Sequence, residues 1–452
     1  MRRPSVSRGR LEEKAEKMPW FVERSEEITP NRIRELMEQA VSEAKSRICP
    51  HPKRVLLLPP DITRMHSGAG RMTEILYEIL HKDCDVHVIP TLGQHEPHTP
   101  QQNRLMFGSI PNERIHAHHW IETVVPVGEI SADFVREATH GAADWAIPIE
   151  LNTMLMKEPW DLVINVGHVV PHEVLGFANH NKNYFIGLAG KSTICASHIA
   201  AACCGIENNL GTLTTPIRAC YNKAEQDFLS DLPDFYIQIV MARNAEDRLV
   251  HTGIYVGDDL ETYTAAARQS REQNIKVFEE PIPKVVCVMQ EDEFVSTWVA
   301  NKAVYRTRMV MADGGELVII APGLKRFGEQ EEVDRLIRKY GYVGTPRVME
   351  LYRKNADLQD LAHAAAHLIH GSSEGRFTIT YAPGHLTREE IEGVNFGYAD
   401  LGETLRRYPP DRMKEGWNTT PSGEEVYFIP TPSAGLWSTR KKLYERPAGF
   451  EC

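Results

Sequence analysis

Residues 54–64 read Arg-Val-Leu-Leu-Leu-Pro-Pro-Asp-Ile-Thr-Arg, an apolar run that ends in a polar loop. A continuous apolar run is typical of a strand that is buried on both faces of a parallel sheet. Residues 70–82 follow with apolar side chains at helical spacing, and residues 86–90 form a second apolar run, Val-His-Val-Ile-Pro. This alternation of strand and helix predicts an α/β fold with a mostly parallel sheet covered by helices.

The same alternation continues along the chain and restarts near residue 270. Strands are expected at 162–166, 284–289, 317–321 and 376–381, and helices at 31–46, 131–138, 191–204, 261–276, 330–340 and 357–370. We therefore expect two α/β domains with an active-site cleft between them. The expected ranges are a mobile tail at 1–18, an N-terminal cofactor domain at 19–270 and a C-terminal domain at 271–424. The last apolar run, 425–430, could return to either domain, so that 425–452 is a candidate completion of the first.

Composition narrows the class of protein. The 452 residues are 42% hydrophobic and 25% charged, which is ordinary for a globular protein and excludes wholesale disorder or a coiled coil. A net charge of −11 does not favour a nucleic-acid partner. No apolar run approaches the roughly 20 residues that cross a membrane, and no apolar stretch follows the basic N-terminus as in a secretory signal. The eight cysteines contain no Cys-x-x-Cys pair, so we expect reduced thiols in a cytoplasmic protein.

Polar side chains follow three of the predicted strands at the point where each strand ends. In open parallel sheets, ligands bind beyond the carboxyl ends of the strands. One histidine in such a loop is more often structural than functional, but three loops on one edge predict a site together. The side chains that this edge gathers are Asp61, Arg64, His95, His98, His168 and His172.

Two further patterns have competing interpretations. Residues 187–193 contain glycines ahead of a predicted helix, as an anion-binding loop does, but their spacing is not that of a nucleotide triphosphatase. His363, His367 and His370 share one face of the helix expected at 357–370. Because Ala364 stands where a His-Glu-x-x-His zinc motif has Glu, we expect a solvated face here rather than a zinc pair.

These loops resemble the nickel-dependent lactate racemase family of 2-hydroxyacid racemases and epimerases, over roughly residues 50–435. That family carries Asp-Asp-x-Thr-Arg-Pro where this chain has Pro-Asp-Ile-Thr-Arg-Met at 60–65, and His-Arg-Pro-x-Thr where it has His-Glu-Pro-His-Thr at 95–99. The family's Pro-His is followed by a Lys ten residues later and a His sixteen residues after that. Here Pro171-His172, Lys182 and His198 keep those intervals.

The resemblance implies a cofactor and a reaction. The cofactor is pyridinium-3,5-bisthiocarboxylic acid mononucleotide, a nickel-pincer nucleotide, which Lys182 would hold as a thioamide while His198 binds the nickel. The reaction is inversion of C2 of a 2-hydroxy acid by reversible hydride transfer. His95 and His172 would be the two general bases. The side chains that would bind the substrate are Arg64, Asp61 and Lys302, the last by its match to a lysine on the first helix of the family's second domain.

The chain also departs from the family pattern. Ala178-Asn179-His180-Asn181 replaces a Ser-Gly-Gly stretch, Trp298-Val299 replaces Tyr-Gln, and Glu96 replaces Arg. The extra polar groups of Asn179, His180, Asn181 and His98 favour a sugar acid over lactate as substrate.

Two alternatives stay open from the sequence. One is a zinc-dependent hydrolase or lyase that uses His95, His98 and His172 as ligands. The other is a non-catalytic carrier of the nickel cofactor, which would need Lys182 and His198 but not both bases.

Overall fold

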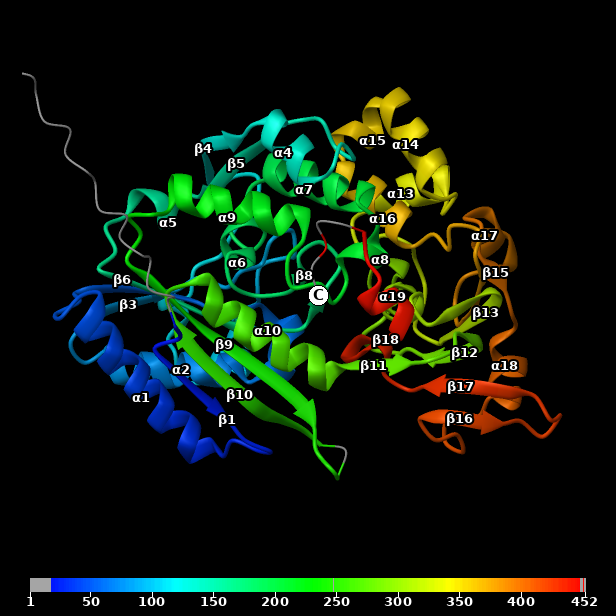
Figure 1. Cartoon of the computed structure of the whole chain (residues 1–452), viewed down its shortest axis with the longest axis horizontal. Helices are drawn as coiled ribbons and strands as arrows, with labels where there is room; N and C mark the ends of the chain where they lie inside the picture. The colour runs from blue at the N-terminus through cyan, green and yellow to red at the C-terminus, as the bar shows by residue number, and fades with distance from the viewer. Residues whose placement is uncertain (1–17, 247, 448–449, 451–452) are drawn as a thin grey trace, which may run out of the picture.

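The computed structural model describes residues 18–246, 248–447 and 450. The predicted tail therefore lies, apart from Met18, outside the described residues. Figure 1 shows two halves side by side, each built on a sheet flanked by helices. The mixed, mostly parallel strands confirm the α/β fold that the sequence predicts. The first sheet uses strands between residues 21 and 257 and the second uses strands between 282 and 429. A domain boundary near residue 270 stays a prediction.

The first sheet has the strand order β1-β10-β9-β6-β2-β3. Strands β3, β2, β6 and β9 run parallel, and β10 and β1 add to the β9 edge in antiparallel pairing. Leu57 pairs with Val88 of β3 and with Ile164 of β6, so these strands end at the same edge. The strands are β1 (Phe21–Arg24), β2 (Arg54–Leu58), β3 (Asp85–Val88), β6 (Leu162–His168), β9 (Asp234–Arg243) and β10 (Leu249–Gly257).

Helices cover both faces of this sheet, as its continuous apolar strands require. Along β2, Leu57 belongs to the core under the first two helices, whereas Leu56 and Leu58 belong to the core on the opposite face. This is the two-residue alternation of a strand buried on both sides. The helices are α1 (Pro30–Arg47), α2 (Ala69–Leu80), α3 (Pro100–Phe107), α4 (Ala132–Ala138), α5 (Thr153–Lys157), α6 (Lys182–Phe185), α7 (Lys191–Cys203), α8 (Ile206–Asn209), α9 (Pro216–Phe228) and α10 (Leu260–Asn274).

Smaller elements complete the first half. The 3-10 helices η1 (Ile62–Ser67) and η2 (Asn112–Arg114) follow β2 and α3. Two hairpins are formed by β4 (Val124–Ile130) with β5 (Ile147–Asn152), and by β7 (Pro171–His172) with β8 (Gly176–Phe177).

The second sheet has the order β15-β14-β13-β12-β17-β16 and is parallel except for β16. Because β17 pairs with β12, the run at 425–430 joins the second sheet, one of the two placements that the sequence leaves open. The strands are β12 (Ile282–Val288), β13 (Met311–Ala321), β14 (Thr378–Pro383), β15 (Gly397–Tyr398), β16 (Gly416–Thr419) and β17 (Glu425–Ile429). A separate parallel pair joins β11 (Ile275–Phe278) to β18 (Leu436–Thr439).

The helix expected at 357–370 is interrupted at Leu361, whose backbone leaves the helical region (φ −116°, ψ 55°). The helices of this half are α11 (Thr297–Ala300), α12 (Lys302–Thr307), α13 (Glu331–Tyr340), α14 (Thr345–Lys354), α15 (Ala356–Asp360), α16 (Ala362–His370), α17 (Arg388–Gly393), α18 (Leu401–Arg407), the 3-10 helix η3 (Pro432–Ala434) and α19 (Arg440–Tyr444).

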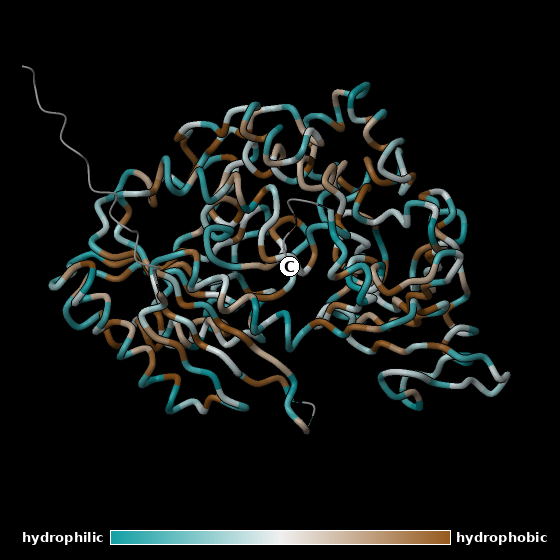
Figure 2. The backbone as a smooth tube through the Cα atoms, in the orientation of Figure 1, coloured by the Kyte–Doolittle hydropathy of each residue, from teal (hydrophilic) through white to brown (hydrophobic). Residues whose placement is uncertain are grey.

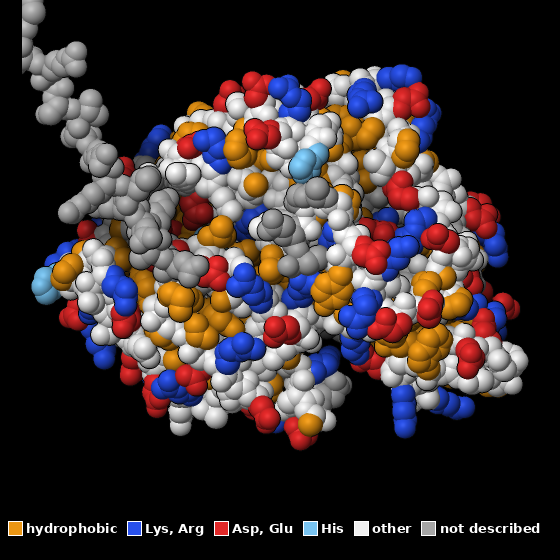
Figure 3. Space-filling model, in the orientation of Figure 1, with side chains coloured by type: hydrophobic (Ala, Val, Ile, Leu, Met, Phe, Trp, Pro, Cys, Tyr) orange, Lys and Arg blue, Asp and Glu red, His pale blue; other side chains and the backbone are white. Residues whose placement is uncertain are grey.

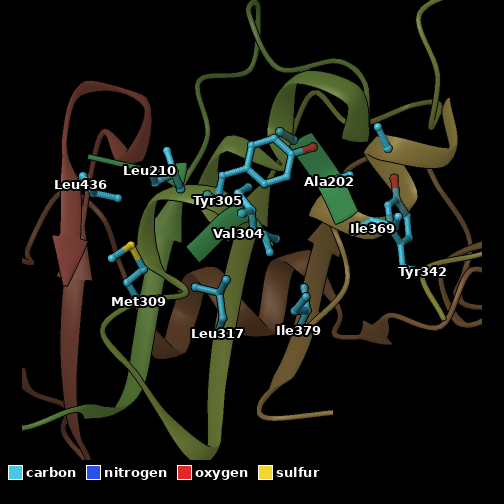
Figure 4. Packing of buried hydrophobic residues seen from close by; sticks show 14 of the residues in the cluster. Ala202, Leu210, Val304, Tyr305, Met309, Leu317, Tyr342, Ile369, Ile379 and Leu436 are labelled. Carbon is cyan, nitrogen blue, oxygen red and sulfur yellow. The ribbon is translucent and has the colours of Figure 1, made fainter. Parts of the chain in front are cut away.

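The two halves share one apolar core. Ala202 and Leu210 of the first half belong to the same buried cluster as Val304 and Ile369 of the second, and Figure 4 shows these side chains gathered in one region. Helix α7 packs against α16 across this junction. The site-bearing helices of the two halves are therefore held together by a continuous core.

Hydrophobic stretches follow the strands inside both halves (Figure 2), while positive and negative side chains intermingle over the face seen in Figure 3. None of the helices in the described part of the chain is both long and apolar enough to span a bilayer. The cysteines that the structure describes, all but Cys452, form no disulfide.

Candidate active site

The loops after β2 and β3 meet through Asp61 and His95. Asp61 caps η1, and its Oδ1 accepts hydrogen bonds from the backbone N–H of Thr63 at 3.1 Å and from the Thr63 hydroxyl at 2.6 Å. Its Oδ2 is bonded to Nδ1 of His95. Burial by itself raises the pKa of Asp61, but the hydrogen bond and charge of His95 outweigh it, and the pKa lies well below its usual range. These contacts make Asp61 a partner of His95, whereas the sequence placed it in the substrate-binding group.

His95 also lines a small pocket between the two halves. The second half contributes Trp298 and His363 to the wall of this pocket. The side chain of His95 is 43% exposed, so its ring lies at the surface of the site. The larger active-site cleft that the sequence predicts stays a prediction.

Arg64 and Lys302 bring positive charge to the site from opposite halves. Lys302 begins α12, and burial lowers its pKa, with a further lowering from the charge of Arg64. Arg64 likewise lowers the pKa of Lys182, after the larger effect of burial. One guanidinium therefore interacts with ammonium groups of both halves, an excess of positive charge that suits an anionic ligand.

His172 and Lys182 lie in the loop region after β6. Nδ1 of His172 accepts the backbone N–H of Val174 at 3.2 Å. Burial lowers the pKa of His172 to about 3, so its ring is neutral at pH 7. Burial also lowers the pKa of Lys182 to about 8. Because of this lowered pKa, a larger share of Lys182 than of an ordinary lysine is the uncharged, nucleophilic amine that a covalent attachment requires.

His198 lies on α7 with its tautomer fixed. Nδ1 donates to the backbone carbonyl of Ile194 at 2.8 Å, which leaves the lone pair of Nε2 available. Metal-binding histidines are commonly oriented in this way by a bond from the other ring nitrogen. The pKa of His198 is lowered, mainly by burial, and the charges of Glu173 and Lys182 also act on it.

These residues fit the cofactor that the family resemblance implies. Lys182 offers a partly buried amine of lowered pKa, His198 offers one free imidazole nitrogen, and the charges of the two side chains interact. Nickel bound by the cofactor's own sulfur and carbon atoms needs a single protein ligand, and imidazole suits nickel. Among the described residues, no group of three or more His, Cys, Asp or Glu side chains is arranged to hold a metal ion by itself.

His98, which the zinc alternative needs as a ligand, has both ring nitrogens occupied. Nε2 accepts the backbone N–H of Ile62 at 2.8 Å, and Nδ1 lies 3.1 Å from Oδ1 of Asn103. The ring therefore holds the loop after β3 against η1. These contacts give the zinc alternative no support.

The polar side chains that suggested a sugar-acid substrate make hydrogen bonds or packing contacts within the protein. Asn179 donates to the carbonyl of Gly167 at 3.0 Å and to Gln238 at 2.7 Å. Asn181 donates to Asn222 and Glu225, and the ring of His180 packs 4.1 Å from that of Tyr236. The sequence argument for a sugar acid from these residues and His98 therefore fails, because each of these side chains is packed or bonded within the fold.

The glycine-containing loop at 187–193 is not open to an anion. At the N-terminus of α7, the backbone N–H and hydroxyl of Ser192 both donate to the carboxylate of Glu150, at 3.1 Å each. A protein carboxylate thus occupies the position that a phosphate would take.

The histidines of α16 are buried, so the prediction of a solvated helix face is wrong. His367 lies 2.8 Å from the hydroxyl of Tyr305 and 2.9 Å from that of Tyr342, and Trp298 stacks on it with ring centroids 4.3 Å apart. His363 lies 3.4 Å from Sγ of Cys195 on α7. Helix α16 packs against α7 of the first half. The small alanines between these histidines were the sequence signal that this helix is buried.

Three charged or polar side chains at the site were missed by sequence reasoning: Glu173, Arg306 and His370. Glu173 directly follows His172, and Arg306 lies four residues after Lys302, one helical turn along the same face of α12. That spacing was the available signal for Arg306. His370 ends α16 and interacts electrostatically with both Glu173 and His198.

Comparison with known proteins finds a matching family model and similar solved structures. The family model of the lactate racemase N-terminal domain matches residues 21–209. The crystal structure of a Thermotoga maritima protein superposes with a TM-score of 0.76 at 25% identity, covering 92% of this chain and 100% of that one. The lactate racemase apoprotein from Thermoanaerobacterium thermosaccharolyticum shares the fold with a TM-score of 0.63 at 14% identity, covering 90% of this chain and 92% of that one. The search of curated proteins finds no match. Residues 21–209 of this chain are therefore similar to the lactate racemase N-terminal domain, and the chain shares its fold with the lactate racemase apoprotein.

Proposed function

We propose that this protein is an isomerase that inverts C2 of a 2-hydroxy acid with a nickel-pincer nucleotide attached to Lys182. One observation carries the proposal: the buried His172 interacts electrostatically with Lys182 and His198, which are both partly buried. The chemistry that the cofactor supplies when bound is reversible acceptance of a hydride from C2. The match to the lactate racemase N-terminal domain supports the proposal.

The roles of the chain's own residues follow from their chemistry. His198 holds the metal through Nε2, because Nδ1 is committed to the carbonyl of Ile194. Arg64 and Lys302 bind the substrate carboxylate and hydroxyl from opposite halves of the protein. His95 and His172 exchange the hydroxyl proton, one for each enantiomer. His172 is a neutral base at pH 7, and Asp61 orients His95 so that Nε2 points away from the carboxylate.

Intact mass, nickel content and C2 inversion test the proposal together. The protein is expressed with and without enzymes that make the cofactor, and lactate and larger 2-hydroxy acids are offered as substrates. We expect a mass increment on Lys182, about one nickel per chain and interconversion of the two C2 isomers. A loaded protein that inverts none of the acids supports the carrier alternative. An unmodified Lys182 in an active, zinc-containing protein would overturn the proposal.

A further inference from the structure

We propose that His87 and His116 form a further metal site, which binds a divalent copper or nickel ion at the edge of the first sheet. Nδ1 of His87 lies 2.8 Å from Nε2 of His116, so two imidazole nitrogens face each other directly. Neither histidine belongs to the candidate active site, and the metal site does not depend on the proposed function.

The fold brings the two histidines together beside β3, an edge strand of the first sheet. The segment after η2 extends the sheet beyond this strand. Val88 forms a parallel bridge with Ile115, and the backbone N–H of His116 donates to the carbonyl of Val88 at 2.8 Å. Side chains alternate along a strand, so Asp85 and His87 share one face of β3 while Val88 enters the core on the other. The side chain of His87 is 15% exposed, so a metal ion can reach the pair from solvent.

Asp85 fixes which nitrogen of His87 carries the hydrogen. Its Oδ2 lies 3.0 Å from Nε2 of His87, and Arg114 donates to its Oδ1. The hydrogen bond from His87 is the main cause that lowers the pKa of Asp85, so the carboxylate is ionised and can only accept. In the neutral ring, Nδ1 of His87 therefore keeps the lone pair that faces His116. Metal-binding histidines commonly donate their other ring N–H to a carboxylate in this way.

The separation of the two nitrogens suits a metal ion with right-angled coordination. At metal–nitrogen distances of about 2.0–2.1 Å, ligands at a right angle lie about 3 Å apart and ligands at a tetrahedral angle about 3.3 Å apart. The observed 2.8 Å favours the tetragonal ions Cu²⁺ and Ni²⁺ over Zn²⁺.

Binding replaces the hydrogen that the two rings share. His116 changes tautomer, its hydrogen passing from Nε2 to Nδ1 through solvent, and no proton is gained or lost. Each ring turns so that its nitrogen points at the metal, which sits beside the line between them. Water completes the coordination, since the protein supplies two ligands.

The charges around the pair do not oppose a cation. Arg54 and Arg114 are near, but Arg54 pairs with Glu158 at 2.6 Å and Arg114 pairs with Asp85. Burial, together with the charge of His87, lowers the pKa of His116. The ring of His116 is therefore neutral at pH 7, and a metal ion does not have to displace a second proton from it.

Calorimetric titration with CuCl₂, NiCl₂ and ZnCl₂ tests the site in cofactor-free protein that has been dialysed against EDTA. We expect Cu²⁺ to bind most tightly and Zn²⁺ least, and Cu²⁺ to raise the Tm because it binds the folded state. His87→Asn and His116→Asn should each remove about one Cu²⁺ per chain, and Asp85→Asn should weaken binding about tenfold or more. The matched control is His119→Asn, because His119 is exposed and close to His116 in the sequence.

Trp160 provides a readout in protein with both histidines intact. Its ring meets that of His87 edge-on, with centroids 5.6 Å apart, and paramagnetic Cu²⁺ quenches the fluorescence of a nearby indole. Quenching should saturate together with the calorimetric signal, and the quenched component should be missing from Trp160→Phe protein. Diamagnetic Zn²⁺ should not quench it.

The outcomes are distinct. Loss of Cu²⁺ in folded His87→Asn and His116→Asn proteins, with His119→Asn unchanged, supports the site. Equal Cu²⁺ binding by His87→Asn and His119→Asn overturns it. Weak binding that leaves Trp160 unquenched is adventitious surface binding only and also overturns it. If a histidine variant does not fold, the comparison of wild type with Trp160→Phe decides. Because the protein carries no cofactor, none of these results depends on the proposed reaction.

Discussion

The carboxylate of Asp61 is bonded to Nδ1 of His95, and this bond joins the loops that follow two neighbouring parallel strands. Asp61 is buried while His95 is 43% exposed on its side chain, so the buried acid orients the ring that borders the site. A neutral imidazole that donates from Nδ1 carries its lone pair on Nε2. The relationship therefore prepares His95 as a proton acceptor.

Asp61→Asn should lower the rate of C2 inversion by about 10²-fold or more, because the amide can bond either tautomer of His95. Turnover of cofactor-loaded protein measures the loss, and ¹⁵N NMR of His95 reports the tautomer. Thr63→Val is the matched control, since it removes the hydroxyl contact of Asp61 with Thr63 and leaves the bond to His95. Wild-type turnover in the loaded Asp61→Asn protein would contradict this role.

The carboxylate of Asp61 should also make the free energy of unfolding depend on pH. Its pKa is lower in the folded protein than in the unfolded chain, where Asp titrates near about 3.9. A lowered acid pKa stabilises the fold above the unfolded pKa, and this contribution is lost as the pH falls toward the folded pKa. Asp61→Asn should therefore lower the free energy of unfolding at pH 7 and have a smaller effect at pH 3. Urea unfolding at the two pH values measures the difference.

Lys182→Met should change the free energy of unfolding at pH 7 in the opposite direction. Burial lowers the pKa of Lys182 to about 8, against about 10.4 in an unfolded chain, so its charged form opposes folding below pH 8. Removing the amine should raise the free energy of unfolding of cofactor-free protein at pH 7, by on the order of 3 kcal/mol at most. The gain should shrink as the pH rises toward 10. Urea unfolding at pH 7 and pH 9.5 tests this, with the exposed Lys354→Met as control.

Strand ends were predictable from the sequence because apolar runs and the turns after them are local signals. Asp61, His95 and His172 were found in this way, and the structure places their loops at one edge of the first sheet. The position of β17 was not predictable, since a short apolar strand pairs equally well in either sheet. Only tertiary packing decides between such placements.

The burial and pairing of polar side chains were harder to predict from the sequence than the strands. Asn179 reads as an exposed amide in the sequence, but it bonds carbonyls brought close by the fold. His367 reads as a solvated helix residue, but Trp298 and two tyrosines from other segments enclose it. Arg306 has a local signal in its spacing from Lys302, but the charge of Glu173 that acts on it comes from more than a hundred residues earlier in the chain. Long-range contacts of this kind leave no local pattern.

His198→Ala should lower nickel content without detaching the nucleotide, because Lys182 carries the covalent bond. Elemental analysis and intact mass measure the two properties on the same sample. His180→Asn is the matched control: His180 lies two residues before Lys182, but its ring is packed between Tyr236 and Tyr263, with ring centroids 4.1 and 5.3 Å away. Nickel at wild-type level in His198→Ala, with loss in His180→Asn, would reverse the assignment.

The two candidate bases provide the most direct test of the reaction. The C2 hydroxyl points to opposite sides in the two isomers, so inversion needs a proton acceptor for each. His95 follows β3 and His172 follows β6, two strands that flank β2 in the sheet. Histidines on separate loops can therefore approach one substrate from different directions.

His95→Asn and His172→Asn should each reduce inversion by about 10²–10⁴-fold. The loss should be equal in the two directions, because a catalyst cannot shift the equilibrium between the isomers. Nickel and the mass increment on Lys182 should stay at wild-type levels, since neither histidine is assigned to cofactor binding. The exposed His119→Asn serves as control and should keep wild-type turnover.

The pH dependence adds a second criterion for His172. Burial lowers its pKa to about 3, so in the free protein the ring stays unprotonated, and able to accept a proton, down to that pH. Protonation of His172 therefore cannot produce a loss of kcat/KM between pH 5 and 7, and any such acidic limb belongs to another group. We expect the limb to persist, with unchanged midpoint, in the residual activity of His172→Asn protein. A limb that disappears in that variant would show that His172 titrates near neutrality and is open to solvent, against the buried, neutral base inferred from the structure.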